Sequence, residues 1–256
     1  MPRAVKRDDR YRNLLRPLRT EVPRCIREGS ARHLPAEATR SDPRVLPKVV
    51  IYDIDLTLSL PIGISASSGL NAIAHAAEAL YAREGNPIIS LMAEEGIAAL
   101  SRSLPAIMAR PDDLEARSDA LYGAWLCGTC LGSVGMALHH KICHTLGGTF
   151  NLPHAETHAI VLPHVLAFNA PTVPEAMQRM ARAFGAVDAI QGLNALCARL
   201  DIARSLRAIG MPEDGIERAA ELVVSNAYWN PRLVDRTQAQ ELIRRAWHGH
   251  TAREME

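Results

Sequence analysis

The sequence lacks any apolar run that approaches the roughly 18 to 20 residues needed by a transmembrane helix. Its basic N-terminus is not followed by an apolar segment, so we expect no secretory signal. The five cysteines are an odd number at irregular spacing, which argues against a disulfide framework. These absences predict a cytoplasmic protein without a membrane partner.

The chain also lacks an excess of charge, but its charges are unevenly distributed. The 29 basic and 28 acidic side chains leave a net charge of +1. Segment 1–44 alone carries 12 basic and 6 acidic residues, with few apolar residues and no long periodic stretch. We therefore expect this Arg-rich segment to be disordered or aberrant. A basic arm for nucleic acid is the alternative, but no aromatic or glycine residues alternate with the basic ones, so we expect no nucleic-acid partner.

The remainder of the 256-residue chain predicts a mainly helical fold. The β-branched run 48–53 predicts one buried strand, and 61–68 predicts a loop. Gly147 and Gly148 are expected to break the chain, and Thr237 with Gln240 to form a capping box. The expected helices cover 67–83, 87–108, 113–144, 154 onward with a limit or kink at Pro163, 174–185, 188–200, 202–209, 212–228 and 238–248.

Histidines carry the clearest chemical signal in the sequence. Two pairs at i,i+4 spacing bracket the Gly-Gly pair, and a third predicted helix places one more histidine on a face with an amide and a carboxylate. These residues are His140 and His144, His154 and His158, and Asn71, His75 and Glu78. Converging imidazoles suit a divalent metal or a proton-relay pocket. The spacing is not that of a metalloprotease, because the helix lacks the Glu of H-E-x-x-H.

Cys127 and Cys130 match the pattern C-x-x-C of a redox dithiol. They lie in the middle of an apolar predicted helix, whereas a thioredoxin-type pair follows a strand at a helix start. We therefore interpret both as small buried side chains.

Three segments resemble the iron-containing alcohol dehydrogenase superfamily, and most closely its maleylacetate reductase branch. They read SGLNAIAHAAEALYA over 68–82, ALYGAWLCGTCLG over 120–132 and HHKICHTLGGTFNLPHAETHA over 139–159. The resemblance covers the chain from about residue 42 to its C-terminus. It implies that 61–256 is the C-terminal helical, catalytic domain of the dehydroquinate synthase-like fold. It also implies that 45–60, with its single strand, is a remnant of the dinucleotide-binding domain.

The resemblance implies an NADH- or NADPH-dependent oxidoreductase that reduces maleylacetate, a small dicarboxylate, to 3-oxoadipate in aromatic-compound catabolism. Its implied catalytic residues are His75, His140, His144 and His154. Its implied substrate-binding residues are Asn71, Lys141 and His158, and Leu56 and Thr57 are implied on the cofactor side. Metal-dependent relatives hold iron or zinc with an Asp and three His, which would fall here on Asn71, His75, His140 and His154. An amide oxygen is a poor ligand for these metals beside imidazole, so we expect no bound metal.

One departure concerns the nucleotide site. The chain contains no G-x-G-x-x-G and no other glycine-rich strand–helix turn, although family members carry such a turn upstream. We therefore expect the chain to be truncated or frame-shifted. Whether it keeps the activity of the family is left open by the sequence. The alternatives are a metal-dependent alcohol dehydrogenase that tolerates Asn71, and a non-catalytic remnant or binding module. A homodimer is a further open possibility.

Overall fold

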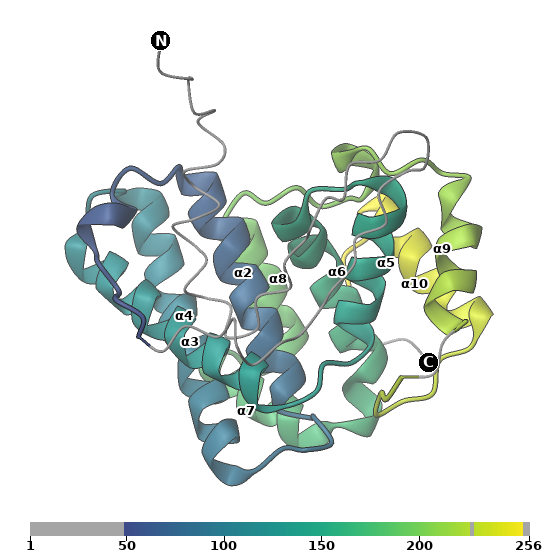
Figure 1. Ribbon diagram of the computed structural model, residues 1–256, viewed down its shortest axis with the longest axis horizontal. Coiled ribbons are helices and arrows are strands. Elements are labelled where there is room, and N and C mark those ends of the chain that lie inside the picture. Colours follow the sequence, from purple (N-terminus) through teal and green to yellow (C-terminus); the bar gives the residue numbers. More distant parts are fainter. Residues whose placement is uncertain (1–48, 226–227, 253–256) are drawn as a thin grey trace.

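The computed structural model describes residues 49–225 and 228–252, which form helices connected by short turns (Figure 1). This confirms the mainly helical fold class, and the described residues contain no strand. The α-helices are α2 (Ile62–Ala79), α3 (Pro87–Ala109), α4 (Leu114–Ser133), α5 (Leu138–Phe150), α6 (His154–Asn169), α7 (Pro174–Phe184), α8 (Ala189–Arg199), α9 (Gly215–Val224) and α10 (Arg236–His248). Short 3-10 helices are η3 (Asp55–Thr57), η4 (Ala170–Thr172) and η5 (Arg207–Ile209).

Helix α6 belongs to both large hydrophobic clusters of the described chain. Leu162 and Leu166 pack into the cluster formed with α2, α3, α4, α7 and α8. Val161 and Val165 pack into the cluster formed with α5, α9 and α10. Every residue from 157 to 169 is buried, as expected for a helix that is apolar on all sides. Figure 1 accordingly shows α6 in the middle, with α2 and α8 on one side and α5 and α10 on the other.

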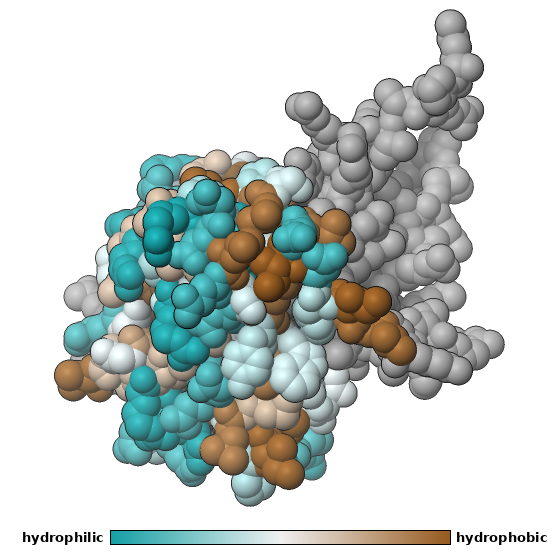
Figure 2. Space-filling view, turned by 90° about the vertical axis from the view of Figure 1, so that its left-hand side faces the viewer, coloured by the Kyte–Doolittle hydropathy of each residue, from teal (hydrophilic) through white to brown (hydrophobic). Residues whose placement is uncertain are grey.

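Helices α3 and α4 form a closely packed antiparallel pair beside α2. A Cβ atom added to Gly96 would lie 2.9 Å from Cys127 Sγ, and one added to Gly123 would lie 2.9 Å from Leu100 Cγ. Cys127 and Cys130 are fully buried, which confirms their structural interpretation, and burial raises the pKa of Cys130 to about 12. The outer side of this pair shows separate apolar areas among hydrophilic ones (Figure 2). Its exposed apolar side chains are Ile88, Leu91, Leu114, Tyr122 and Trp125.

The predicted strand at 48–53 is wrong for its described part. Residues 49–53 have no strand, and Val49 and Ile51 are 77% and 80% exposed. A strand needs a neighbour to pair its backbone groups, and the described residues offer none. Segment 1–44 and residues 45–48 lie outside the described part of the chain.

The predicted loop at 61–68 is also wrong, because α2 already begins at Ile62. Ser67 does not cap a helix but is buried within α2. Ser65 is buried too, and its Oγ accepts a hydrogen bond of 3.1 Å from Arg117 Nη1. The predicted cap position at Ser67 is therefore wrong, because this residue lies inside the helix that begins at Ile62.

The single helix predicted from 113 to 144 is in fact α4 and α5, which meet at a bend of 94°. Val134 is extended, and Gly135 N donates to the Glu84 carboxylate at 3.2 Å. Conversely, Gly147 and Gly148 do not break the chain, because α5 continues to Phe150. It ends where Asn151 adopts the left-handed conformation with a φ of 52°. Two interior glycines cost roughly 2 kcal/mol of helix propensity, which tertiary packing of α5 offsets.

The remaining boundaries divide into confirmed and corrected ones. Helices α3, α7 and α8 lie within one residue or so of the ranges predicted for them, and α6 continues past Pro163 to Asn169. The predicted helix 202–209 is reduced to η5, and 212–228 to α9. The capping box of α10 joins Asp235 and Gln238 rather than Thr237 and Gln240, so it begins two residues earlier.

Among the described residues, no single helix has the length and apolar composition to cross a membrane. Helices α4 and α5 meet both criteria only as a pair, across their 94° bend.

We expect Gly96→Ala to lower the free energy of unfolding by about 1–2 kcal/mol, because the added methyl group overpacks the contact with Cys127 and the Gly123 carbonyl oxygen. The matched control is Gly63→Ala in α2, where a Cβ meets no atom within 4 Å. That change should raise stability by up to about 1 kcal/mol through helix propensity. Urea denaturation checks both, and equal effects of the two substitutions would contradict the packing argument.

Candidate active site

Five histidine rings meet where α2, α5 and α6 pack together. His75 comes from α2, and the two i,i+4 pairs come from α5 and α6. Neighbouring ring centroids are separated by 5.0 Å for His75–His140, 5.9 Å for His140–His144, 6.3 Å for His144–His154 and 4.2 Å for His154–His158. The structure therefore brings together all the histidines that the spacing pattern selected, and we refer to these five as the histidine cluster.

The histidine cluster has an open edge and a buried interior. His144 is exposed and His154 is partly buried. His75 and His140 are only 5% and 6% exposed, and His158 is completely buried. A small molecule approaching the cluster therefore meets His144 and His154 first.

The carboxylate of Glu78 is fully buried beneath the cluster. Its two oxygens accept hydrogen bonds of 2.8 Å each from the backbone N–H groups of Ala137 and His139, at the start of α5. Its Oε2 also lies 2.7 Å from His140 Nδ1. Glu78 thus satisfies two N–H groups that have no partner within the helix, and it fixes the orientation of the His140 ring.

Burial raises the pKa of Glu78 to about 7, although the backbone hydrogen bonds act in the opposite direction. The carboxyl of Glu78 therefore binds and releases its proton in the neutral pH range, within hydrogen-bonding distance of His140 Nδ1. From the sequence, Glu78 was placed on the face of Asn71 and His75 but was given no role. The available signal was that Glu78 is the only acidic residue of α2, since a carboxylate in a buried helix needs buried partners.

A sixth histidine, His139, lies behind the cluster and was also assigned no role from the sequence. His139 Nε2 and His158 Nδ1 are 3.1 Å apart, and both side chains are completely buried. Burial, followed by the neighbouring histidines, lowers the pKa of each ring well below its ordinary value. The pair is therefore neutral, with one ring donating the hydrogen bond and the other accepting it.

The other predicted site residues lie at different distances from the histidine cluster. Asn71 is one turn before His75 on α2, and its Oδ1 is buried without a hydrogen-bond partner in the described part of the chain. Lys141 Nζ instead lies over the Tyr228 ring, 5.7 Å from its centroid.

Leu56 and Thr57, predicted on the cofactor side, belong to η3. Leu56 is 55% exposed, and the Thr57 hydroxyl donates to the backbone oxygen of Ile54 at 2.7 Å.

The positions at which the resemblance implies a metal ion do not match the ligands that iron prefers. They present three imidazoles and the amide oxygen of Asn71, without an anionic group. The nearby carboxylate of Glu78 is already engaged by Ala137, His139 and His140. Non-haem iron sites combine imidazole with carboxylate, so this set of donors fits Fe²⁺ poorly.

A dinucleotide likewise finds no phosphate-binding cradle in residues 49–225 and 228–252. Such a cradle is a glycine-rich turn between a strand and a helix N-terminus, and this part of the chain has no strand. The described residues therefore contain no strand–turn–helix cradle for a pyrophosphate.

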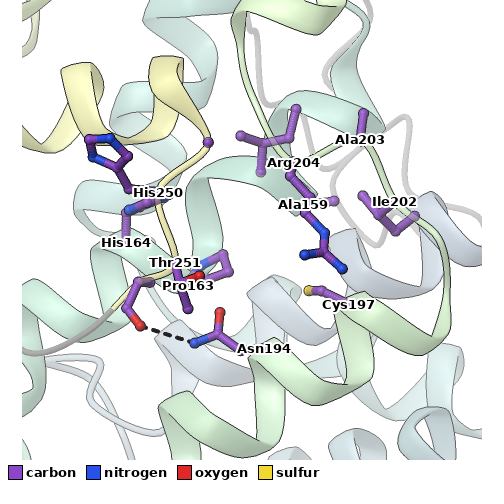
Figure 3. A pocket seen from close by; sticks show the side chains of 13 residues that line it. Ala159, Pro163, His164, Asn194, Cys197, Ile202, Ala203, Arg204, His250 and Thr251 are labelled. Carbon is purple, nitrogen blue, oxygen red and sulfur yellow. Dashed lines mark hydrogen bonds between the residues drawn. The ribbon is translucent and has the colours of Figure 1, made fainter.

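A small cavity, separate from the histidine cluster, lies on another face of α6, where Ala159 and Pro163 line it (Figure 3). Arg204, Cys197 and His164 also face it, and burial lowers the pKa of His164 to about 4. Its volume is about 90 Å³, whereas pockets for small-molecule ligands usually enclose at least about 300 Å³. It is therefore a weaker candidate than the histidine cluster.

Comparisons with known proteins found similar sequences and structures. Residues 65–247 match the family model described as the Fe-containing alcohol dehydrogenase family, C-terminal. The chain is 58% identical over 211 residues to a maleylacetate reductase of Burkholderia cepacia, covering 82% of this chain and 60% of that protein. The crystal structure of maleylacetate reductase from Rhizobium sp. strain MTP-10005 superposes with a TM-score of 0.80 at 52% identity. That match covers 84% of this chain and 61% of the other. The chain thus spans about three fifths of the length of these relatives.

We expect Glu78→Gln to remove one component of the pH dependence of stability. A carboxyl with a raised pKa in the folded chain binds its proton more tightly there, so its stabilising contribution is complete below about pH 4.5 and is lost as the pH rises through about 7. The free energy of unfolding of the parent chain should therefore decrease relative to that of Glu78→Gln over this range, by up to about 3 kcal/mol.

Urea denaturation at a series of pH values checks this expectation. His139 and His158 have lowered pKa values and act in the opposite direction below about pH 6.5, but they do so in both proteins and cancel in the comparison. The control is Glu84→Gln, because Glu84 is exposed and accepts only the Gly135 N–H at 3.2 Å. Parallel pH profiles for the parent chain and Glu78→Gln would contradict the buried-proton argument.

Proposed function

The chain belongs to the Fe-containing alcohol dehydrogenase family, and on this premise we propose that it provides the substrate-binding and proton-donating half of a maleylacetate reductase. The proposed reaction is the NADH- or NADPH-dependent reduction of maleylacetate to 3-oxoadipate. The observation that carries the proposal is the histidine cluster above the buried Glu78–His140 pair, in a chain 58% identical to a maleylacetate reductase.

The substrate is a dicarboxylate, so its binding requires hydrogen-bond donors and positive charge. Imidazoles donate as neutral groups and gain a charge near neutral pH, which suits them to an anionic ligand. Asn71 supports the same ligand because an amide adds no negative charge beside it. We assign His144 and His154 to the first contacts with the substrate, because they form the open edge of the cluster.

The reduced nicotinamide, when bound, supplies a hydride to the carbon–carbon double bond conjugated with the substrate carbonyl group. The electron pair of that double bond then moves to the carbonyl oxygen, which becomes an enolate oxygen. His75 and His140 stabilise this negative charge by donating hydrogen bonds. One imidazolium proton passes to the adjacent carbon and completes the reduction.

Glu78 acts in this scheme through His140. Its carboxyl has a pKa of about 7, so the pair can give up and recover a proton near neutral pH. His158 lies deeper than its predicted role in substrate binding requires, with its ring 4.2 Å from His154. We assign it to the support of His154 as well as to the substrate pocket.

We propose that this reaction proceeds without a metal ion, because the donor set around Asn71 fits Fe²⁺ poorly. A metal-dependent alcohol dehydrogenase of the same family is the alternative, and metal analysis separates the two. A non-catalytic binding module is the second alternative, which an activity assay separates.

Replacing Asn71 by Asp should raise the affinity for Fe²⁺ at least about tenfold, since the carboxylate adds the anionic ligand that the site lacks. Anaerobic Fe²⁺ titration measures the change. Asn71→Ala serves as the control, because it removes the amide without adding charge. Stoichiometric, chelator-resistant iron in the unsubstituted chain would contradict the metal-free proposal.

We also expect this chain alone to bind NADH weakly and to turn over maleylacetate at least roughly two orders of magnitude more slowly than a fusion to a family nucleotide-binding domain. Hydride transfer requires the nicotinamide to be held about 3–3.5 Å from the accepting carbon, and small misplacements are costly. Fluorescence titration and a steady-state assay of both proteins check this. Full activity of the unfused chain would contradict the proposal that it supplies only the substrate-binding half of the enzyme. An inactive fusion would favour the alternative of a non-catalytic binding module.

A further inference from the structure

Three buried side chains next to the histidine cluster form a separate group. His139 and Cys143 are one turn apart on α5, and His158 faces them from α6. Their exposures are 0%, 2% and 0%. One nitrogen or sulfur atom from each lies within 4.8 Å of those of the other two.

The separations within this group are close to those between the ligands of one metal ion. With Zn–N distances of 2.0–2.1 Å, a Zn–S distance of 2.3 Å and tetrahedral angles, two nitrogens are about 3.3 Å apart and a nitrogen and a sulfur about 3.6 Å. The observed distances are 3.1 Å from His139 Nε2 to His158 Nδ1 and 3.8 Å from His139 Nε2 to Cys143 Sγ. Two of the three separations therefore match these values within a few tenths of an ångström, and the third, between His158 and Cys143, lies within 4.8 Å.

The hydrogen bonding of the group also leaves it free to bind a cation. His158 Nε2 is buried and has no hydrogen-bond partner in the described part of the chain. Among the described residues, the ring nitrogens of His158 therefore make one hydrogen bond, to His139, and metal binding breaks no other. The thiol of Cys143 is 3.8 and 3.9 Å from the two His139 nitrogens, too far for a strong hydrogen bond.

We propose that His139, Cys143 and His158 bind one thiophilic cation, Cu⁺ or Zn²⁺. A thiolate with two imidazoles is a soft donor set that selects these ions over Fe²⁺, Mg²⁺ or Ca²⁺. Binding replaces the thiol proton by the metal, so the proton is released and no electron is transferred. The site is distinct from Asn71, His75, His140 and His154, at which the family resemblance implies iron.

Charge and coordination number favour Cu⁺ over Zn²⁺ at this position. One thiolate and two neutral imidazoles leave a Cu⁺ complex with zero net charge, whereas a Zn²⁺ complex keeps one positive charge in a fully buried place. An uncompensated buried charge is costly. Three protein ligands also match the trigonal arrangement of a His₂Cys copper site, while Zn²⁺ prefers a fourth ligand.

The test is anaerobic titration of the full chain with Cu⁺ in competition with a chromophoric Cu⁺ chelator, and separately with Zn²⁺. We expect Cys143→Ala to bind one equivalent of Cu⁺ less than the parent chain, and to lose most of any Zn²⁺ binding. Cys197→Ala is the control, because Cys197 is a partly buried thiol on α8, outside this group and away from the Cys127–Cys130 pair. It should retain the equivalent that Cys143→Ala loses.

A second variant keeps the proposal falsifiable if Cys143→Ala does not fold. His158→Gln should also lose that equivalent, with folding of each variant checked by circular dichroism. Equal Cu⁺ stoichiometry in the parent chain, Cys143→Ala and His158→Gln would overturn the proposal, as would loss of the same equivalent in Cys197→Ala. Neither the titration nor its outcome depends on reductase activity, so failure here is distinguishable from failure of the proposed function.

Discussion

The buried carboxylate of Glu78 is the interaction on which the site depends. No lysine or arginine within residues 49–225 and 228–252 pairs with it, and its partners there are the N–H groups of Ala137 and His139 and the ring of His140. These hydrogen bonds hold the start of α5 against α2, and they stabilise the sharp bend between α4 and α5. The turn then directs the adjacent His139 and His140 rings differently, one toward His158 and the other toward Glu78.

Periodicity alone was sufficient for some elements and misleading for others. Helices α3, α7 and α8 begin with Pro or an Asp cap close to an apolar stripe, so local signals locate them. The bend between α4 and α5 follows Gly132 and Ser133, which favour a turn, but the carboxylate that satisfies the N–H groups after it belongs to Glu78, some 60 residues earlier in the chain. Ser67 shows the opposite error, since a good cap residue is used inside the core. The i,i+4 spacing of His140 with His144 and of His154 with His158 was reliable because it is a property of the helix itself.

The sequence also identified which histidines meet, but not how deeply each is buried. Exposure decreases from His144 through His154 and His140 to His158. Depth decides which rings stay neutral, because burial and the neighbouring histidines lower the pKa values of His139 and His158. Depth follows from how α5 and α6 pack, which spacing along one helix does not contain. This is why Glu78 and His139, both visible in the sequence, acquired their roles only in the structure.

Helix α6 has a consequence for how the described part of the chain unfolds. One of its faces completes the cluster around α2, and another completes the cluster around α5 and α10. Opening either cluster exposes an apolar side of α6 to water, which weakens the support that α6 gives to the other. The two cores therefore behave as one cooperative unit, and the amide hydrogens of α6 exchange with solvent only when the whole unit opens.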